Sequence, residues 1–318
     1  PVEYTSTPIF DQGKRVGAVV IFRDVSERKT AQTKLHATME ALRLALEQVE
    51  QLKHKLELEN AYLQQEISDT FSSQAIVGTS PAVQQINYQI QLVAPTVATV
   101  LVTGESGTGK ELIARAIHRA SDRSGLFVSV NCGAISPTYA DAELFGYSAG
   151  AHSGTASSRA GWFGSANGGT LYLDEIADLP QALQVKLLAA LETREVYRVG
   201  ASQALPVDVR LVAASSIDLG RAVAAGTFDD RLYAYLCDGQ LVFPALRQRV
   251  ADILPLAEYF LGMHAQRLGL AIPAISPAAQ AALEAHRWPG NTRELENVIH
   301  FALLLAGRRD IEPEHLEL

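Results

Sequence analysis

The sequence predicts a domain of the α/β class, and three observations support this assignment. A short apolar run over residues 97–102 is followed by a glycine-rich loop and an amphipathic stretch over residues 111–118. A second apolar run, residues 168–175 (GGTLYLDE), ends in two carboxylates. Beyond Pro244 the pattern becomes helical, over residues 253–268, 277–286 and 292–305. Strands that alternate with helices are typical of α/β folds, and the helical end predicts a second subdomain.

The glycine-rich loop over residues 103–110 (TGESGTGK) has the context that a phosphate-binding P-loop needs. Its glycines let backbone amides turn toward one point, where the helix N-terminus also favours an anion. Lys110 would reach the β- and γ-phosphates as a point charge. The order strand, loop, helix favours this interpretation over a turn with an exposed lysine. Glu111 stands where most P-loops carry the Ser or Thr that contacts magnesium, so another residue must hold the metal.

The two carboxylates at the end of the second run fit that requirement. Asp174 can hold Mg²⁺ directly or through water, and Glu175 can polarise the attacking water for in-line attack on the γ-phosphate. An apolar run that ends in a solvated acidic turn is the alternative for this stretch taken alone. The carboxylate pair and the P-loop together predict a domain that hydrolyses a nucleoside triphosphate.

Three further polar positions are candidates for the same site. Asn131 ends an apolar run over residues 127–132 and could hold Glu175 away from water, or simply form a turn. Ser215 follows another run, 207–214, and could sense the γ-phosphate or close a turn. Arg293 lies in the first turn of a predicted helix, where a cation opposes the helix dipole. A phosphate contact would explain it, and a surface arginine is the alternative.

Composition sets limits on the rest. The 318 residues are enough for two or three domains, and the net charge of −8 gives no support for broad nucleic-acid binding. No stretch has the length of a transmembrane helix, and no signal peptide opens the chain. The two cysteines, Cys132 and Cys237, lie far apart and suggest reduced thiols in a cytoplasmic protein. Pro1 in place of Met suggests a fragment of a longer protein.

The N-terminal 70 residues differ in character from the rest. Residues 2–10 and 16–22 predict two strands joined by a hairpin turn, and residues 17–29 resemble the last strand and exit of a PAS sensor domain. From residue 28 to about residue 67 there is no Pro or Gly, and apolar side chains recur every seven positions at Leu35, Leu42, Val49, Leu56 and Leu63. This heptad predicts a coiled coil that makes the chain dimeric. One long helix packed on its own domain is the alternative.

The segment between residues 146 and 169 is rich in Gly, Ser and Ala. Such a composition packs poorly, so we expect a surface loop that moves with the nucleotide state. His152 within it has no second metal-type ligand nearby, which favours a solvated loop histidine.

Residues 76–318 resemble the bacterial enhancer-binding proteins, the AAA+ activators of sigma-54 RNA polymerase. The resemblance is carried by residues 104–111 (GESGTGKE), 143–146 (ELFG), 169–176 (GTLYLDEI) and 288–295 (WPGNTREL). Residues 59–67 are similar to the helix that precedes the family's ATPase domain. The resemblance implies a three-layer αβα AAA+ domain with a C-terminal helical lid. It also implies a ring, usually a hexamer, with ATP bound between subunits.

The same resemblance implies roles for individual residues. Asp174 would be the Mg²⁺ ligand, Glu175 the catalytic carboxylate, and Asn131 the switch residue paired with it. Ser215 would lie at sensor I. The ATP-binding positions would be Gly104, Glu105, Ser106, Gly107, Thr108, Gly109, Lys110, Glu111 and the sensor II residue Arg293.

The sequence departs from the family pattern in two places. The family's sigma-factor loop reads GAFTGA, but residues 150–155 read GAHSGT, so His152 replaces an aromatic contact. The family's arginine fingers lie in FRxDLYYRL, which here is FDDRLYAYL at residues 228–236. Asp229 and Tyr235 occupy the finger positions, and Arg231 lies nearby in a different register. An arginine supplied in trans accelerates phosphoryl transfer by orders of magnitude, so the sequence predicts weak hydrolysis.

The predicted organisation has four parts: the end of a PAS domain (residues 1–29), a coiled coil (30–70), the AAA+ α/β subdomain (71–246) and the lid (247–318). We expect an ATP-binding transcription regulator whose partners are sigma-54 RNA polymerase holoenzyme and further copies of itself. DNA would be bound only through a domain after Leu318, and no membrane contact is expected. The alternatives are a relative that uses ATP as a switch without remodelling sigma-54, and a non-catalytic scaffold.

Overall fold

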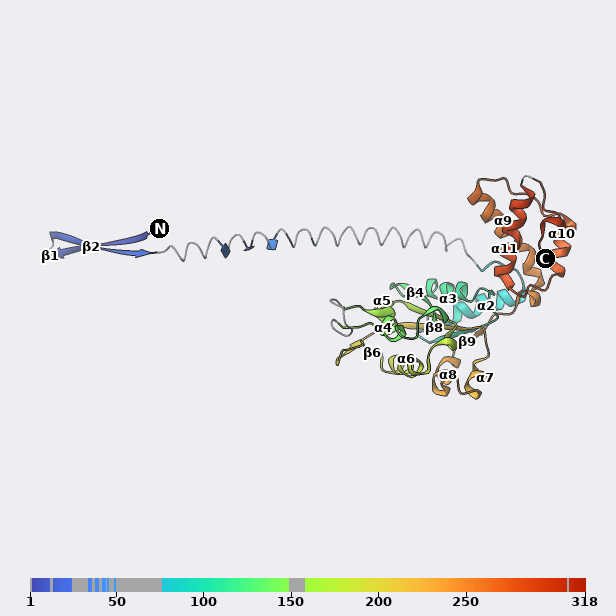
Figure 1. The fold of residues 1–318 in the computed structure, drawn as a ribbon, viewed down its shortest axis with the longest axis horizontal. Helices are drawn as coiled ribbons and strands as arrows, with labels where there is room; N and C mark the ends of the chain where they lie inside the picture. Colours follow the sequence, from blue (N-terminus) through green and yellow to red (C-terminus); the bar gives the residue numbers. More distant parts are fainter. Residues whose placement is uncertain are drawn as a thin grey trace. The chain divides into compact units, whose positions relative to one another are not determined.

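The computed structural model describes residues 2–11, 14–24, 76–148, 158–307 and 309–318, and the single positions 34, 35, 38, 39, 42, 43, 45 and 49. The chain divides into two compact units, Pro1–Ser73 and Gln74–Leu318, and each is described by itself. Figure 1 shows the fold of both units. Among the described residues, no helix combines the length and the apolar character needed to cross a lipid bilayer.

The first unit contains the predicted hairpin. Strands β1 (Val2–Asp11) and β2 (Lys14–Asp24) pair antiparallel, from Val2 opposite Asp24 to Asp11 opposite Lys14. The apolar side chains of residues 2–9 and 17–22 are exposed, including Tyr4 at 71% and Phe22 at 70%. The predicted coiled coil falls largely outside the described residues. Its described positions are helical, and the heptad residues Leu35, Leu42 and Val49 are exposed.

A five-stranded parallel sheet forms the centre of the second unit. Its strands lie in the order β4-β5-β8-β3-β9. Their bounds are Val100–Thr103 for β3, Phe127–Asn131 for β4, Thr170–Asp174 for β5, Arg210–Ser215 for β8 and Gln240–Val242 for β9. Because β8 lies between β3 and β5, the loops after these three strands meet at one edge of the sheet.

Alternating strand residues are buried on opposite faces of this sheet. Val100, Tyr172 and Val212 pack against helices α2 (Pro81–Val93) and α3 (Lys110–Arg119). Their neighbours Leu101, Leu171 and Leu211 belong to the core on the other face, with α6 (Gln181–Thr193), α7 (Leu219–Ala224) and α8 (Asp230–Cys237). Figure 1 shows these two helix layers on either side of the strands. The predicted α/β class is confirmed.

The segment after residue 146 is more ordered than its composition suggests. Helices α4 (Ala140–Phe145) and α5 (Gly161–Ser165) pack together, and the rings of Phe145 and Phe163 stack with centroids 5.5 Å apart. Phe163 is 1% exposed. The expectation of a loose surface loop is therefore wrong for residues 161–166, because one buried aromatic anchors them. Residues 149–157, including His152, lie outside the described part.

Strands β6 (Glu195–Tyr197) and β7 (Ala204–Pro206) form an antiparallel ribbon.

A separate helical subdomain with its own core follows the sheet. It consists of α9 (Ile253–Leu268), α10 (Pro277–Ala285) and α11 (Asn291–Ala306), which agree with the predicted helices to within one residue at each end. Short 3₁₀ turns complete the fold at Cys132–Ala134, Ile176–Asp178, Leu246–Gln248, Val250–Asp252 and Pro313–His315. Trp288 is fully buried in this core and donates to the Leu283 carbonyl at 2.9 Å. This is the predicted lid.

A buried carboxylate ties the lid to the start of the α/β subdomain. Asp252 is 0% exposed and accepts hydrogen bonds from the amides of Thr79 and Ser80, both at 2.8 Å, and from the Ser80 hydroxyl at 2.6 Å. Ser80 also caps α2, accepting from the Val83 amide, with Pro81 at the first helical position. The segment that enters α2 is thereby fixed to the lid.

Candidate functional site

The glycine-rich loop joins β3 to α3, as predicted. Gly107 and Gly109 have φ angles of +76° and +106°, a region that side chains with a Cβ rarely adopt. Lys110 is the first residue of α3, and its side chain is 6% exposed. Its ammonium group donates to the Gly104 carbonyl at 3.0 Å and to the Glu105 carbonyl at 3.4 Å. A buried cation inside a ring of loop backbone is suited to bind phosphate.

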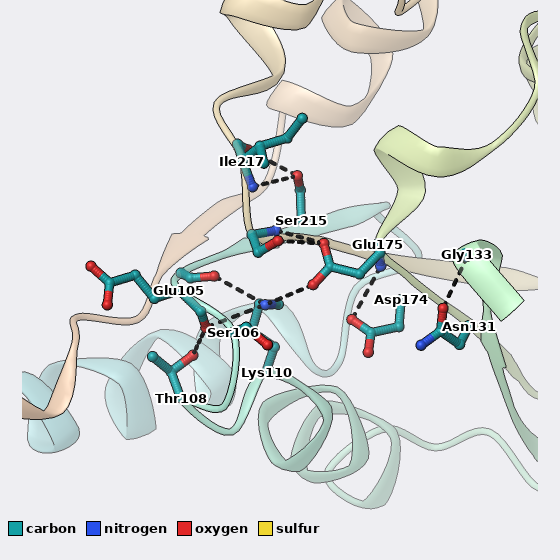
Figure 2. Close-up of polar contacts among 12 residues, drawn as sticks. Glu105, Ser106, Thr108, Lys110, Asn131, Gly133, Asp174, Glu175, Ser215 and Ile217 are labelled. Carbon is teal, nitrogen blue, oxygen red and sulfur yellow. Dashed lines mark hydrogen bonds and ion pairs between the residues drawn. The ribbon is translucent and has the colours of Figure 1, made fainter. Parts of the chain in front are cut away.

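Asp174 ends β5 and Glu175 follows it, at the same edge of the sheet (Figure 2). Glu175 has a φ angle of +49°, and its Oε1 lies 3.4 Å from Lys110 Nζ. Asp174 Oδ1 accepts from the Tyr172 hydroxyl at 3.0 Å and from the Glu175 amide at 3.1 Å. No hydrogen bond to Asp174 Oδ2 is found among the described residues, so one carboxylate oxygen is available for a cation. The donor chemistry therefore fits Mg²⁺, which prefers carboxylate oxygen.

Ser216 holds the Glu175 side chain from the other side. Glu175 Oε2 accepts from the Ser216 amide at 2.9 Å and from its hydroxyl at 2.7 Å. Burial raises the pKa of Glu175, but the hydrogen bonds from Ser216 and the charge of Lys110 outweigh it, and the pKa is lowered. The carboxylate is therefore ionised and fully engaged.

Asn131 does not contact Glu175, and the Ser215 hydroxyl lies in a local turn. Asn131 Oδ1 accepts from the Gly133 amide at 2.9 Å, and no hydrogen bond to Glu175 is formed in the described structure (Figure 2). Ser215 Oγ donates to the Ile217 carbonyl at 2.8 Å and closes a turn. The turn-forming alternative describes both residues here. Because β8 lies between β3 and β5, the next residue, Ser216, reaches Glu175, and strand order was the missing information.

The two remaining predicted ligands, Glu111 and Arg293, have different surroundings. Glu111 turns along its own helix and accepts from Arg115 Nη2 at 2.7 Å, so it does not face the carboxylates. Arg293 lies beside the P-loop, with its amide 3.3 Å from the Gly107 carbonyl. It lines a cleft of about 350 Å³ together with Ser106 and Glu294.

The two positions expected to carry arginine fingers have structural roles. Asp229 caps α8, and its Oδ1 accepts from the Leu232 amide at 2.8 Å. Tyr235 is half-buried and packs against the core of the α/β subdomain. Arg231, on the same helix, is 71% exposed and lies 3.3 Å from Glu192 Oε1. It is the exposed cation that α8 presents.

Lid residues that sequence reasoning missed also contact the P-loop. Glu105 Oε2 accepts from Arg247 Nη1 at 2.8 Å and from Asn291 Nδ2 at 3.2 Å. These hydrogen bonds lower the pKa of Glu105 to about 2. No local sequence signal indicates such contacts, because the partners are separated by 142 and 186 positions.

Comparisons with known proteins agree with this geometry. The sequence profile of the sigma-54 interaction domain matches residues 76–241, and that of the AAA+ ATPase lid domain matches residues 247–318. The sigma-54-dependent transcriptional regulator SfnR of Pseudomonas fluorescens (strain Pf0-1) is 47% identical over 253 residues, covering 79% of this chain and 69% of SfnR. The transcriptional regulatory protein ZraR of Escherichia coli (strain K12) is 46% identical over 250 residues, covering 78% of this chain and 57% of ZraR.

Solved structures show the same fold. Crystal structures of NtrX from Brucella abortus in complex with ATP and with ADP superpose with TM-scores of 0.73 and 0.72, at 38% and 37% identity. They cover 83% and 82% of this chain, which spans 59% and 58% of the NtrX chains. This chain belongs to the sigma-54-dependent transcriptional activators, a family of ATP-binding AAA+ proteins.

Proposed function

We propose that the edge of the sheet between the P-loop and the lid is the ATP site of this regulator. The observation that carries the proposal is the chain of contacts Lys110–Glu175–Ser216, which places a buried cation and an ionised carboxylate at the ends of three adjacent strands. Lys110 would bind the β- and γ-phosphates, and Asp174 would hold Mg²⁺, which would supply positive charge against the phosphates. Arg293 supplies a second cation from the lid.

Glu175 acts as the general base in this proposal. A base must reach the attacking water with a free carboxylate oxygen, and both oxygens of Glu175 are engaged, with Lys110 and Ser216. The geometry described is thus a restrained state, and release of the Ser216 contact is the step that frees the base. The loss of both arginine fingers leaves the transition state under-stabilised, while binding through Lys110 and the loop amides is retained.

A binding experiment tests the site. Lys110→Ala removes the phosphate-contacting charge and should weaken ATP binding by about tenfold or more in calorimetry. Lys186→Gln, which breaks a surface ion pair with Asp141, is the matched control and should bind like the wild type. Equal affinities for wild type and Lys110→Ala would remove the assignment.

We also propose a weaker contact with sigma-54 than relatives with an aromatic loop residue make. His152 cannot reproduce the packing of a phenylalanine, and burying a charged imidazole is costly. Retention of sigma-54 in a pull-down with a transition-state nucleotide analogue, at the level shown by a family member that carries the aromatic loop residue, would contradict this.

For the N-terminal unit we propose a PAS-derived end followed by a dimeric coiled coil. The exposed apolar side chains of the β1–β2 hairpin support an origin in a larger sheet, because an isolated two-stranded hairpin is marginally stable in water. A peptide of residues 28–67 should gain helicity with concentration in circular dichroism. Helicity independent of concentration would indicate a single intramolecular helix.

A switch that binds ATP without remodelling sigma-54 is the second candidate function. The capping role of Asp229 and the packing of Tyr235 on the core favour it, because neither residue supplies the cation that a finger needs.

A further inference from the structure

The carbonyl groups of the P-loop are held by side chains and amides from the lid. The Ser106 carbonyl accepts from Asn291 Nδ2 at 3.0 Å. The Gly107 carbonyl accepts from the amides of Thr292 at 3.0 Å and Arg293 at 3.3 Å. The Thr108 carbonyl accepts from Arg249 Nη2 at 3.0 Å. Three consecutive carbonyls thus point toward the lid.

This orientation fixes the amides as well. In a trans peptide the C=O group and the following N–H group point in opposite directions. The carbonyls of Ser106 and Thr108 therefore direct the amides of Gly107 and Gly109 away from the lid, into the loop where phosphate would bind. The P-loop and the lid approach so closely here that a Cβ on Gly107 would lie 2.3 Å from the Gly290 carbonyl oxygen. No residue larger than glycine fits this contact without a shift of the backbone.

The donors are themselves held rigidly. Asn291 is fully buried, with a φ angle of +55°, and its Oδ1 accepts from the Leu246 amide at 2.8 Å. Its amide group is thereby oriented with both Nδ2 hydrogens toward the P-loop. Arg249 is 4% exposed and stacks on the Phe243 ring, with 4.2 Å between Cζ and the ring centroid. Rigid donors determine the loop conformation rather than follow it.

Glu105 adds a charged contact to this arrangement. Its carboxylate points away from Lys110 and Glu175 (Figure 2) and forms a bidentate ion pair with Arg247. A P-loop side chain that could have competed with phosphate for Lys110 is thus turned to the lid.

We propose that Asn291 and Arg247 are positioning residues, which preorganise the P-loop amides for phosphate by holding the opposite, carbonyl side of the loop against the lid. The inference rests on the proposed nucleotide site and deepens it. Nucleotide affinity is then set partly by lid contacts that do not touch the nucleotide, since ordering a loop before binding removes that entropic cost from the binding step.

Two substitutions test this role in the full chain, with ATP and ADP as probes. Arg247→Gln removes the exposed ion pair and should weaken the binding of both nucleotides by about threefold to tenfold. Asn291→Asp keeps the acceptor for the Leu246 amide but loses both Nδ2 hydrogens. It should weaken the binding of both nucleotides by about tenfold or more. The surface ion-pair variant Lys186→Gln is the control and should leave affinity unchanged.

A double-mutant cycle separates positioning from simple stability. Glu105→Gln and Arg247→Gln, measured on ATP affinity, should be strongly non-additive, with the double variant no weaker than either single. Unchanged ATP affinity in Arg247→Gln and Asn291→Asp, even with a lower unfolding temperature, would overturn the proposal. If Asn291→Asp does not fold, the exposed Arg247→Gln still decides. Loss of binding in Lys110→Ala but not in the lid variants would refute this inference and leave the nucleotide site intact.

Discussion

Glu175, which we propose as the general base, is held in place by its neighbours. Its carboxylate accepts two hydrogen bonds from Ser216 and faces Lys110. The sequence predicted Glu175 as a candidate and offered Asn131 as its partner or as a turn former. Asn131 Oδ1 instead accepts from the Gly133 amide, because a side chain this short satisfies the nearest unpaired backbone donor.

Ser216→Ala should raise the pKa of Glu175, because one of the hydrogen bonds that favours the charged form is lost. Asn131→Ala should leave that pKa unchanged. The measurement is a carboxyl ¹³C NMR titration of both variants. A shift in Asn131→Ala together with none in Ser216→Ala would show that Asn131 is the partner in solution.

Glu105 gives a pH dependence with a defined sign. Its folded pKa is lowered from 4.5 to about 2 by Arg247 and Asn291. A depressed carboxyl pKa contributes stability that is present above the unfolded pKa and is lost as the pH falls toward about 2. The wild type should therefore exceed Glu105→Gln in stability above pH 4.5, with the difference shrinking below it. The gap is small, because the pair is exposed. Urea unfolding at pH 7 and pH 3.5 measures it, and a gap that widens at low pH would contradict the account.

At the scale of elements, sequence signals predicted where helices start better than they predicted how the helices pack. The Ser80–Pro81 cap and the bounds of α9 were predictable because caps and apolar periodicity are local. Helix α5 was missed, since Gly, Ser and Ala around it suggested a loose loop. The stacked pair Phe145–Phe163 decides the matter, and a contact between residues 18 positions apart is not visible in local composition.

The cap of α8 leads to a prediction about Asp229. Asp229→Ala should lower the free energy of unfolding by about 1 kcal/mol, because the Leu232 amide loses its acceptor, whereas Asp229→Ser should be close to neutral. Asp230→Ala, one residue into the helix, is the control and should stay within about 0.5 kcal/mol. Chemical denaturation measures all three. An Asp229→Ala variant as stable as the wild type would deny the cap.

At the scale of the whole molecule, the site is assembled from segments far apart in the chain. The P-loop, the Glu175 turn and Ser216 converge because β8 separates β3 from β5, and the lid joins them through partners such as Arg249 and Thr108, 141 positions apart. Motif spacing predicted the first two pieces. It contained nothing about the lid contacts, which follow only from how two separately packed cores meet.

The family assignment and the altered finger positions point in different directions for catalysis. SfnR and ZraR share nearly half of their residues with this chain over the matched region, and the P-loop and both carboxylates are present. Asp229 caps α8 and Tyr235 packs against the core, and neither carries a positive charge. We therefore expect ATP affinity to be retained and ATP turnover to be slow, since a trans cation contributes to the transition state far more than to binding.

Steady-state ATP hydrolysis across a range of protein concentrations tests this account most directly. Wild type and Arg231→Ala should bind ATP with similar affinity and show the same slow or undetectable turnover at every concentration. Glu175→Gln sets the background. Fast wild-type turnover that rises with protein concentration and is abolished in Arg231→Ala would contradict the account and identify Arg231 as a finger supplied by the neighbouring copy.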